Sequence, residues 1–241
     1  MRSNHSGAAL PFNLKDKTMR PPVQSSSPIS GLIFDLDGVL ISSSDCHRRA
    51  FEEEFARVGV YDFSYRRFSG WRTVDVFRAV FQEKNLTITE EILRDSARRK
   101  SARASELLAV QDSVAEDCVP VVRKLAGRYR LALATSGSRE TVRMFLDRTD
   151  LGPCFQSVLV GEDVQHAKPS PEIFSRSIDA LGLKPEACLV VEDAVAGVQA
   201  ARSAGARVIG FGEEHVAELQ AAGAEQVVKS LTEVAEVLGK L

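Results

Sequence analysis

The chain has 241 residues, of which 44% are apolar and 27% charged, and 31 basic against 33 acidic residues give a net charge of -2. This balance excludes a strongly basic nucleic-acid-binding protein and a highly charged disordered protein. No apolar run approaches the roughly 20 residues that span a bilayer. We therefore expect neither nucleic acid nor a membrane as a partner, and a chain long enough for one large domain with a smaller insert.

The cysteines are widely spaced and form no C-x-x-C pair. They are Cys46, Cys118, Cys154 and Cys188. This spacing argues against a disulfide framework or a structural zinc site, and it is typical of reduced, mostly buried thiols. We therefore predict a cytoplasmic protein.

Residues 1–30 differ in composition from the rest of the chain. They contain a Pro-Pro pair, a serine run, and four basic residues against one acidic residue. Such a segment is typical of a disordered tail. It has no apolar core of the roughly 7–15 residues found in a secretory signal. A transit peptide, a start at Met19 and nucleic-acid binding through the basic side chains are the less favoured alternatives.

Short apolar runs alternate with amphipathic segments over most of the chain. Strands are predicted at residues 31–34, 130–135, 157–160, 188–191, 207–210 and 226–228, and helices at 138–148, 170–181, 194–204, 213–222 and 231–241. This alternation predicts an α/β fold with a doubly wound, Rossmann-like parallel sheet. The carboxyl ends of the strands then share one edge of the sheet, where ligands bind.

Residues 43–112 interrupt the alternation. Segments 45–58, 73–83 and 89–108 look helical, and no clear strand lies between them. We interpret this block as a mostly helical cap domain inserted after the first strand. The core domain would then consist of residues 31–42 and 113–241, with hinges near Ser42–Ser44 and Gln111–Glu116.

Two carboxylates stand two positions apart at the end of the first strand. Asp35 and Asp37 follow the apolar run Leu32–Phe34, and Gly38 comes next. Side chains two apart in an extended chain face the same way, and glycine allows a sharp turn directly afterwards. The ordinary alternative is a strand-end turn with two solvated acids.

Three later strands also end in polar residues. Thr135 and Ser136 precede a glycine, Lys168 precedes Pro169 and Pro171, and Glu192 and Asp193 follow a buried strand. Taken singly, they fit a helix cap, a surface lysine and an N-cap. Taken together, they bring carboxylates, a hydroxyl and a cation to one crevice. Carboxylate and phosphate oxygens are ligands suited to Mg²⁺, so the set predicts phosphoryl transfer to a carboxylate nucleophile.

With these residues in place, the sequence resembles the haloacid dehalogenase superfamily. It is most similar to the β-phosphoglucomutase-like and sugar-phosphatase branch that carries a helical cap, over residues 31–212. The resemblance is carried by four motifs in the expected order, namely Asp35-Leu-Asp37-Gly-Val-Leu, Ala134-Thr135-Ser136, Lys168-Pro169 and Val191-Glu192-Asp193-Ala-Val-Ala-Gly197.

The resemblance implies catalytic roles. Asp35 would attack phosphorus and form an aspartyl-phosphate, while Asp37 would protonate the leaving oxygen and then activate water. Thr135, with Ser136, would hold the transferred group, and Lys168 would orient Asp35. For Asp37 to act as an acid near neutral pH, its pKa must be raised, and crowded carboxylates with cap closure would have that effect.

The resemblance also implies a magnesium site. Asp35, Asp193 with Glu192 alongside, and the main-chain carbonyl of Asp37 would hold Mg²⁺.

The second aspartate, Asp37, excludes a dehalogenase, because a halide needs no protonation, and it argues against phosphonate cleavage.

The cap offers three further candidates for substrate binding. His47 and Lys100 align with cap residues of the mutases, which approach the catalytic acid and the substrate. Arg72 stands one position before the site of a mutase arginine that grips the second phosphate, and Thr73 occupies that site. This displacement favours a phosphatase over a mutase. Trp71 is predicted either to line the pocket or to pack in the cap.

The predicted function is a Mg²⁺-dependent phosphatase for a small phosphorylated metabolite, most simply a sugar phosphate. The alternatives are a β-phosphoglucomutase-type mutase and a non-catalytic binding protein that keeps the fold. Nothing in the chain calls for more than a monomer.

Overall fold

The computed structural model describes residues 28–111 and 113–239 and contains a six-stranded parallel sheet. The strand order is β3-β2-β1-β4-β5-β6. The strands are β1 (Gly31–Phe34), β2 (Arg130–Ala134), β3 (Phe155–Leu159), β4 (Cys188–Glu192), β5 (Arg207–Phe211) and β6 (Gln226–Val228). This order places β1 in the middle of the sheet, between β2 and β4. The predicted α/β fold with a doubly wound sheet is confirmed.

Both faces of the sheet are covered because its strands are apolar on both sides. On β1, Leu32 and Phe34 enter one hydrophobic cluster, whereas Ile33 enters the other. The first cluster includes α4 (Cys118–Ala126), α5 (Arg139–Thr149) and α9 (Leu231–Leu238). The second includes α6 (Glu172–Leu181), α7 (Val195–Ser203) and α8 (Val216–Ala222). Because helices cover both faces of the parallel sheet, a ligand site is left at the carboxyl ends of the strands.

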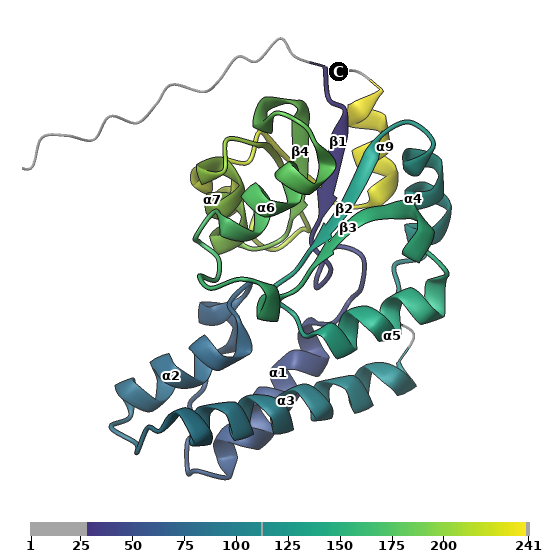
Figure 1. Cartoon of the computed structure of the whole chain (residues 1–241). Coiled ribbons are helices and arrows are strands. Elements are labelled where there is room, and N and C mark those ends of the chain that lie inside the picture. The colour runs from purple at the N-terminus through teal and green to yellow at the C-terminus, as the bar shows by residue number, and fades with distance from the viewer. Residues whose placement is uncertain (1–27, 112, 240–241) are drawn as a thin grey trace, which may run out of the picture.

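The inserted block forms a helical layer next to one edge of the sheet (Figure 1). It consists of α1 (Ser44–Ala56), a 3₁₀ turn (Tyr65–Phe68), α2 (Thr73–Glu83) and α3 (Glu90–Val110). These elements pack around their own aromatic cluster, in which the Phe55 ring lies 4.8 Å from the Phe77 ring. A separate hydrophobic core lets the block keep its shape while its position over the sheet changes.

The two linkers between this block and the sheet pair with each other. The backbone N–H of Ser42 donates to the carbonyl of Ser113 at 2.6 Å, and Ala115 donates to Leu40 at 3.1 Å. From the core, the Arg148 guanidinium donates to the carbonyl of Gln111 at 3.0 Å. The segments expected to act as hinges therefore lie side by side and are hydrogen-bonded to each other.

The structure adjusts several predicted boundaries. The strand expected at 157–160 begins at Phe155, and the helix expected at 213–222 begins at Val216. Helix α4 was not assigned from the sequence. The tail predicted at residues 1–30 lies largely outside the described residues. Within residues 28–111 and 113–239, no helix is long and apolar enough to cross a membrane.

Candidate active site

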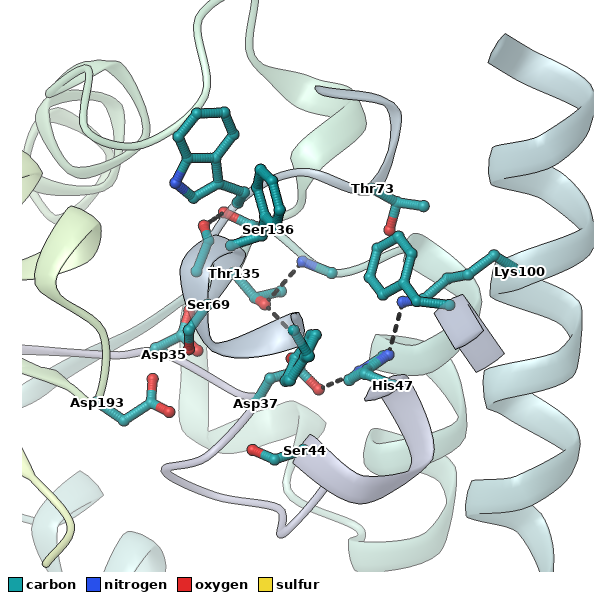
Figure 2. Close-up of a pocket in the computed structure, with 16 residues that line it drawn as sticks. Asp35, Asp37, Ser44, His47, Ser69, Thr73, Lys100, Thr135, Ser136 and Asp193 are labelled. Atoms are coloured by element: carbon teal, nitrogen blue, oxygen red, sulfur yellow. Dashed lines mark hydrogen bonds and ion pairs between the residues drawn. The ribbon is translucent and has the colours of Figure 1, made fainter. Parts of the chain in front are cut away.

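Three neighbouring strands deliver the central residues of the site. Asp35 follows β1, Thr135 follows β2, and Asp193 follows β4. Main-chain hydrogen bonds hold β1 and β4 in register at this point. The N–H of Asp35, for example, donates to the carbonyl of Val191 at 3.0 Å. All three side chains line one pocket together with Asp37. Figure 2 shows the carboxylates of Asp35, Asp37 and Asp193 near one another, with Thr135 close to them.

A buried lysine lies next to Asp35 and holds it in place. The ammonium group of Lys168 donates to Oδ1 of Asp35 at 2.7 Å and to Oε1 of Glu192 at 2.6 Å. The other oxygen of Glu192 accepts the backbone N–H of Ala194 at 2.8 Å. Both oxygens of Glu192 are thus occupied, and neither Glu192 nor Lys168 lines the pocket. Oδ1 of Asp35 accepts from Lys168 and keeps a second lone pair for a cation, whereas Oδ2 accepts no hydrogen bond from the described residues.

This cluster carries more negative than positive charge. Burial raises the pKa of Asp35 to about 7, with Lys168 opposing the shift and Glu192 and Asp37 adding to it. Burial, then Glu192 and Asp35, also raises the pKa of Asp193 well above its usual value. The pKa of Lys168 is raised by the two carboxylates that it contacts, despite its burial. One fixed cation therefore does not balance the acids crowded around it.

Asp37 is bound by the cap through one of its two oxygens. Oδ1 accepts the hydroxyl of Ser43 at 2.6 Å and lies 2.8 Å from Nε2 of His47. Nδ1 of His47 lies 2.8 Å from the ammonium nitrogen of Lys100 (Figure 2). Nε2 of His47 donates to Oδ1 of Asp37, because an ionised carboxylate only accepts hydrogen bonds. Oδ2 is on the side of Thr135, whose hydroxyl lies 3.5 Å away.

These contacts contradict the expectation that the pKa of Asp37 is raised. Burial pushes the pKa upward, but the charge and hydrogen bond of His47 and the hydroxyl of Ser43 hold it well below its usual range. Asp37 is therefore ionised in this state. Burial lowers the pKa of Lys100 to about 7, with Asp37 opposing the shift. The Lys100 ammonium group lies 4.2 Å from the centroid of the Phe51 ring.

The carboxylates fit a hard divalent cation. At Gly38, with φ of +82°, a Cβ would lie only 1.9 Å from Oδ2 of Asp193, so glycine makes room for that carboxylate. Among the described residues, no three His, Cys, Asp or Glu side chains form a metal-binding cluster by themselves. Mg²⁺ typically takes one or two carboxylates and fills its other positions with waters and phosphate oxygens. Asp35 and Asp193 supply that number, and a cation would balance their charge.

The cap closes the pocket with aromatic side chains. Phe51, Tyr65, Phe68 and Trp71 line it opposite the carboxylates. The hydroxyl of Ser136 donates to the carbonyl of Gly70 at 2.7 Å, which ties this wall to the core. Trp71 thus lies in the pocket wall, where its side chain contributes part of the lining.

Not every predicted binding residue reaches this pocket. Thr135, Ser136, His47 and Lys100 line it, whereas Arg72 does not. The Nε of Arg72 donates to Oδ2 of Asp75 at 2.9 Å, and Nη1 donates to the carbonyl of Val164 at 3.2 Å. Asp75, in the first turn of α2, thus holds the guanidinium of the residue that precedes this helix.

Sequence reasoning missed three contributors to the site. Ser43 was treated only as part of a hinge, although its hydroxyl contacts Asp37, and neither Phe51 nor Tyr65 was singled out. Ser43 lies two residues before a predicted helix and six residues after Asp37, which is the only signal the sequence offers. For Tyr65 we find none, because it lies in an irregular segment.

Comparison with known proteins identifies the family. A family model described as haloacid dehalogenase-like hydrolase matches residues 29–205. The chain belongs to this family. Hydrolases of this superfamily generally use a divalent metal ion.

Individual relatives agree with this assignment. The chain is 33% identical to Protein CbbY of Rhodobacter capsulatus over 75% of this chain and 84% of that protein. It is 31% identical to fructose-1-phosphate phosphatase YqaB of Escherichia coli over 73% of this chain and 93% of that protein. The structure of β-phosphoglucomutase from Clostridium difficile has a TM-score of 0.77 at 22% identity, covers 88% of this chain and 98% of its own, and shares the fold. The predicted enzyme class, a phosphatase of this family, is confirmed, while the substrate stays open.

Proposed function

We propose that the protein is a Mg²⁺-dependent phosphatase of small phosphorylated sugars that works through an aspartyl-phosphate on Asp35. The observation that carries the proposal is the pairing of two carboxylates with distinct surroundings in one pocket. Asp35 is fixed by Lys168 at 2.7 Å, and Asp37 is fixed by His47 at 2.8 Å. Each keeps one oxygen toward the pocket, as a nucleophile and a general acid–base pair require.

In the first half-reaction, Oδ2 of Asp35 forms a bond to phosphorus while the bond to the leaving oxygen breaks. Lys168 keeps Asp35 oriented and offsets its charge. The hydroxyl of Thr135, which accepts the N–H of Gly137 at 2.9 Å, lies where it can donate to a phosphoryl oxygen. A magnesium ion held by Asp35, Asp193 and the main-chain carbonyl of Asp37 would supply further neutralisation of the phosphoryl charge.

Asp37 donates and accepts the transferred protons through Oδ2. The leaving oxygen takes a proton from it, and in the second half-reaction the attacking water returns one to it. The ionised Asp37 seen here is the form that accepts a proton from water. It takes up a proton from solvent and becomes the acid when a phosphate dianion lies beside it, because a neighbouring negative charge raises the pKa of a carboxyl group. His47 and Lys100 stabilise its ionised form between turnovers.

Kinship with an E. coli fructose-1-phosphate phosphatase supports a sugar phosphate as the substrate. The main alternative is a mutase, which the shared fold with a β-phosphoglucomutase allows. The capture of Arg72 by Asp75 favours the phosphatase, because a mutase must retain a bisphosphate intermediate and needs a free cation in its cap. We also propose a monomer that resides in the cytoplasm, which light scattering and cell fractionation test.

The deciding experiment measures phosphate release from sugar phosphates and acetyl phosphate, with Mg²⁺ and with a chelator. We expect metal-dependent release that Asp35→Asn lowers by at least about 10⁴-fold, because the nucleophile is lost. Removal of the metal by the chelator should also lower phosphate release. Unchanged turnover in the Asp35→Asn protein contradicts the mechanism. Conversion of β-glucose 1-phosphate to glucose 6-phosphate without phosphate release assigns the enzyme to the mutases.

A further inference from the structure

A second, larger cavity adjoins the catalytic pocket. The pocket at the carboxylates has a free volume of about 40 Å³, whereas the adjoining cavity has about 370 Å³. Thr73, Ser136 and Gly137 line both, so the two spaces meet at these residues. Binding sites for small molecules typically measure about 300–1,000 Å³. The inner pocket therefore suits a phosphoryl group, and the outer cavity has the size of what that group is attached to.

The outer cavity lies between the cap and the core. Helix α3 contributes Ala97, Ser101 and Ala102, and the start of α2 contributes Val74. The core side is formed by residues 136–138, Glu140 and residues 161–162. Small apolar side chains together with hydroxyl groups suit a ligand that presents both C–H faces and hydroxyl groups, as a sugar or a polyol does.

The charges on the cavity wall balance. Its charged lining residues are Arg72, Arg98, Glu140 and Glu162. Arg72 is paired with Asp75 through two nitrogens, at 2.9 and 3.3 Å. The side chain of Arg98 is 74% exposed and lies 3.4 Å from Asp95. A second phosphate would thus meet two carboxylates and two arginines that already have acidic partners. Recognition of a phosphate normally needs an arginine free to form paired hydrogen bonds.

We propose that this cavity binds the leaving group and that it selects an uncharged sugar or polyol over one that carries a second phosphate. The inference rests on the proposed phosphatase function and adds the substrate class and the residues that set it. Glu140 and Glu162 determine the preference by repelling a distal phosphate, and Ala102 leaves the space that the sugar fills. Differences in affinity of this kind arise as much from repulsion of the wrong ligand as from attraction of the right one.

The first test fills the cavity. Ala102→Trp should lower kcat/KM for fructose 1-phosphate by at least about tenfold, because a bulky side chain displaces the sugar. Hydrolysis of acetyl phosphate, whose leaving group is small, should change by less than about twofold. The matched control is Ala109→Trp, an exposed alanine of the same helix that does not line this cavity. Equal effects on the two substrates, or equal effects of the two variants, overturn the proposal.

The second test reverses the charge. The wild-type enzyme should prefer fructose 1-phosphate over fructose 1,6-bisphosphate, which differs only in its distal phosphate. Glu140→Lys with Glu162→Lys should shift the kcat/KM ratio toward the bisphosphate by at least about tenfold. Glu140→Gln with Glu162→Gln is the control and should give an intermediate ratio. A wild-type preference for the bisphosphate, or the same ratio in all three proteins, overturns the proposal.

Different results would contradict the assignment of the cavity and the assignment of the enzyme as a phosphatase. If acetyl phosphate is hydrolysed and no sugar or polyol monophosphate is, the assignment of the cavity is wrong and the phosphatase stands. If no phosphoester releases phosphate with Mg²⁺ present, the proposed function itself is wrong.

Discussion

The core side and the cap side of the active site are built in different ways. On the core side, Asp35, Thr135 and Asp193 stand at the ends of three hydrogen-bonded neighbouring strands, and Lys168 is 4% exposed. On the cap side, His47 and Lys100 come from two helices that belong to a separate hydrophobic cluster. The core side is positioned by the register of the sheet, whereas the cap side is positioned by the docking of one body on another.

This difference separates two tasks. The reacting groups need fixed distances, which a parallel sheet provides because neighbouring strands end at the same edge. The groups that select the substrate and exclude water must move away to admit it. The contacts that cross the boundary range from part-buried ones, such as Ser136 with Gly70, to exposed ones, such as Arg66 with Glu218. Substitutions on the core side should therefore affect both folding and chemistry, and those on the cap side should affect binding and pH response.

Removal of the buried lysine should have the largest effect on stability. In Lys168→Met, Asp35 and Glu192 lose the cation that lies within 2.7 Å of each. Breaking a buried ion pair by removing one partner typically costs about 3–5 kcal/mol of unfolding free energy. We expect a loss of that order, measured by denaturant unfolding, together with a loss of phosphate release.

A second substitution distinguishes the structural role of Lys168 from its catalytic one. Lys168→Met with Glu192→Gln removes one of the two uncompensated acids and should recover most of the lost stability. Activity should stay low, because Asp35 still lacks the group that orients it. Recovery of activity together with stability contradicts a role for Lys168 in positioning Asp35.

The same division explains what the sequence predicts. Asp35, Thr135, Lys168 and Asp193 follow apolar strands, and an alternating α/β pattern brings such positions to one edge of the sheet. Pattern alone therefore places them together. Periodicity in the cap shows which side of a helix is apolar, but it does not give the rotation of the helix over the sheet or the rotamers of long side chains. Arg72 illustrates this limit, since Asp75 three residues later holds its guanidinium at 2.9 Å.

Protonation states were the hardest feature to predict. Crowded carboxylates argued for a raised pKa at Asp37, yet the charge of His47 and the hydrogen bonds of His47 and Ser43 to a single oxygen lower it. A motif reports which acids are near, and hydrogen-bond geometry decides which of them stays ionised.

The cap side should give the protein a measurable pH dependence through Lys100. Its pKa falls from 10.5 to about 7 on folding, mainly because of burial. Between these values the unfolded chain binds more protons than the folded one, so stability contributed by this group rises with pH from about 7 to 10.5. In Lys100→Met that contribution is absent. The stability of the variant relative to wild type should fall as pH rises, by at most about 1.4 kcal/mol per pH unit.

Denaturant unfolding at several pH values between 7 and 10 measures this slope. The control is Arg103→Met on the same helix, where an exposed arginine is paired with Glu53 and Glu106 at the surface. It should leave the slope unchanged. A slope that is the same in Lys100→Met and wild type shows that Lys100 is protonated in the folded state throughout this range.

The smallest expected effect concerns the exposed pair that joins the cap to the core. The Arg66 guanidinium lies 3.2 Å from Glu218, and the two side chains are 70% and 51% exposed. Exposed ion pairs contribute about 0–1 kcal/mol, which limits the change in cap closure to a factor of about five. Arg66→Ala should therefore raise KM by at most that factor and leave kcat nearly unchanged.

The neighbouring Arg67 provides the matched comparison. It pairs with Glu83 at 2.9 Å, and both residues belong to the cap, so their contact is the same whether the cap is open or closed. Arg67→Ala should leave KM unchanged, while the effect of Arg66→Ala should shrink as salt screens the pair. Equal and salt-independent effects of the two substitutions would mean that the pair between cap and core does not contribute to closure, and that closure depends on the buried contacts of Ser136 and His47 instead.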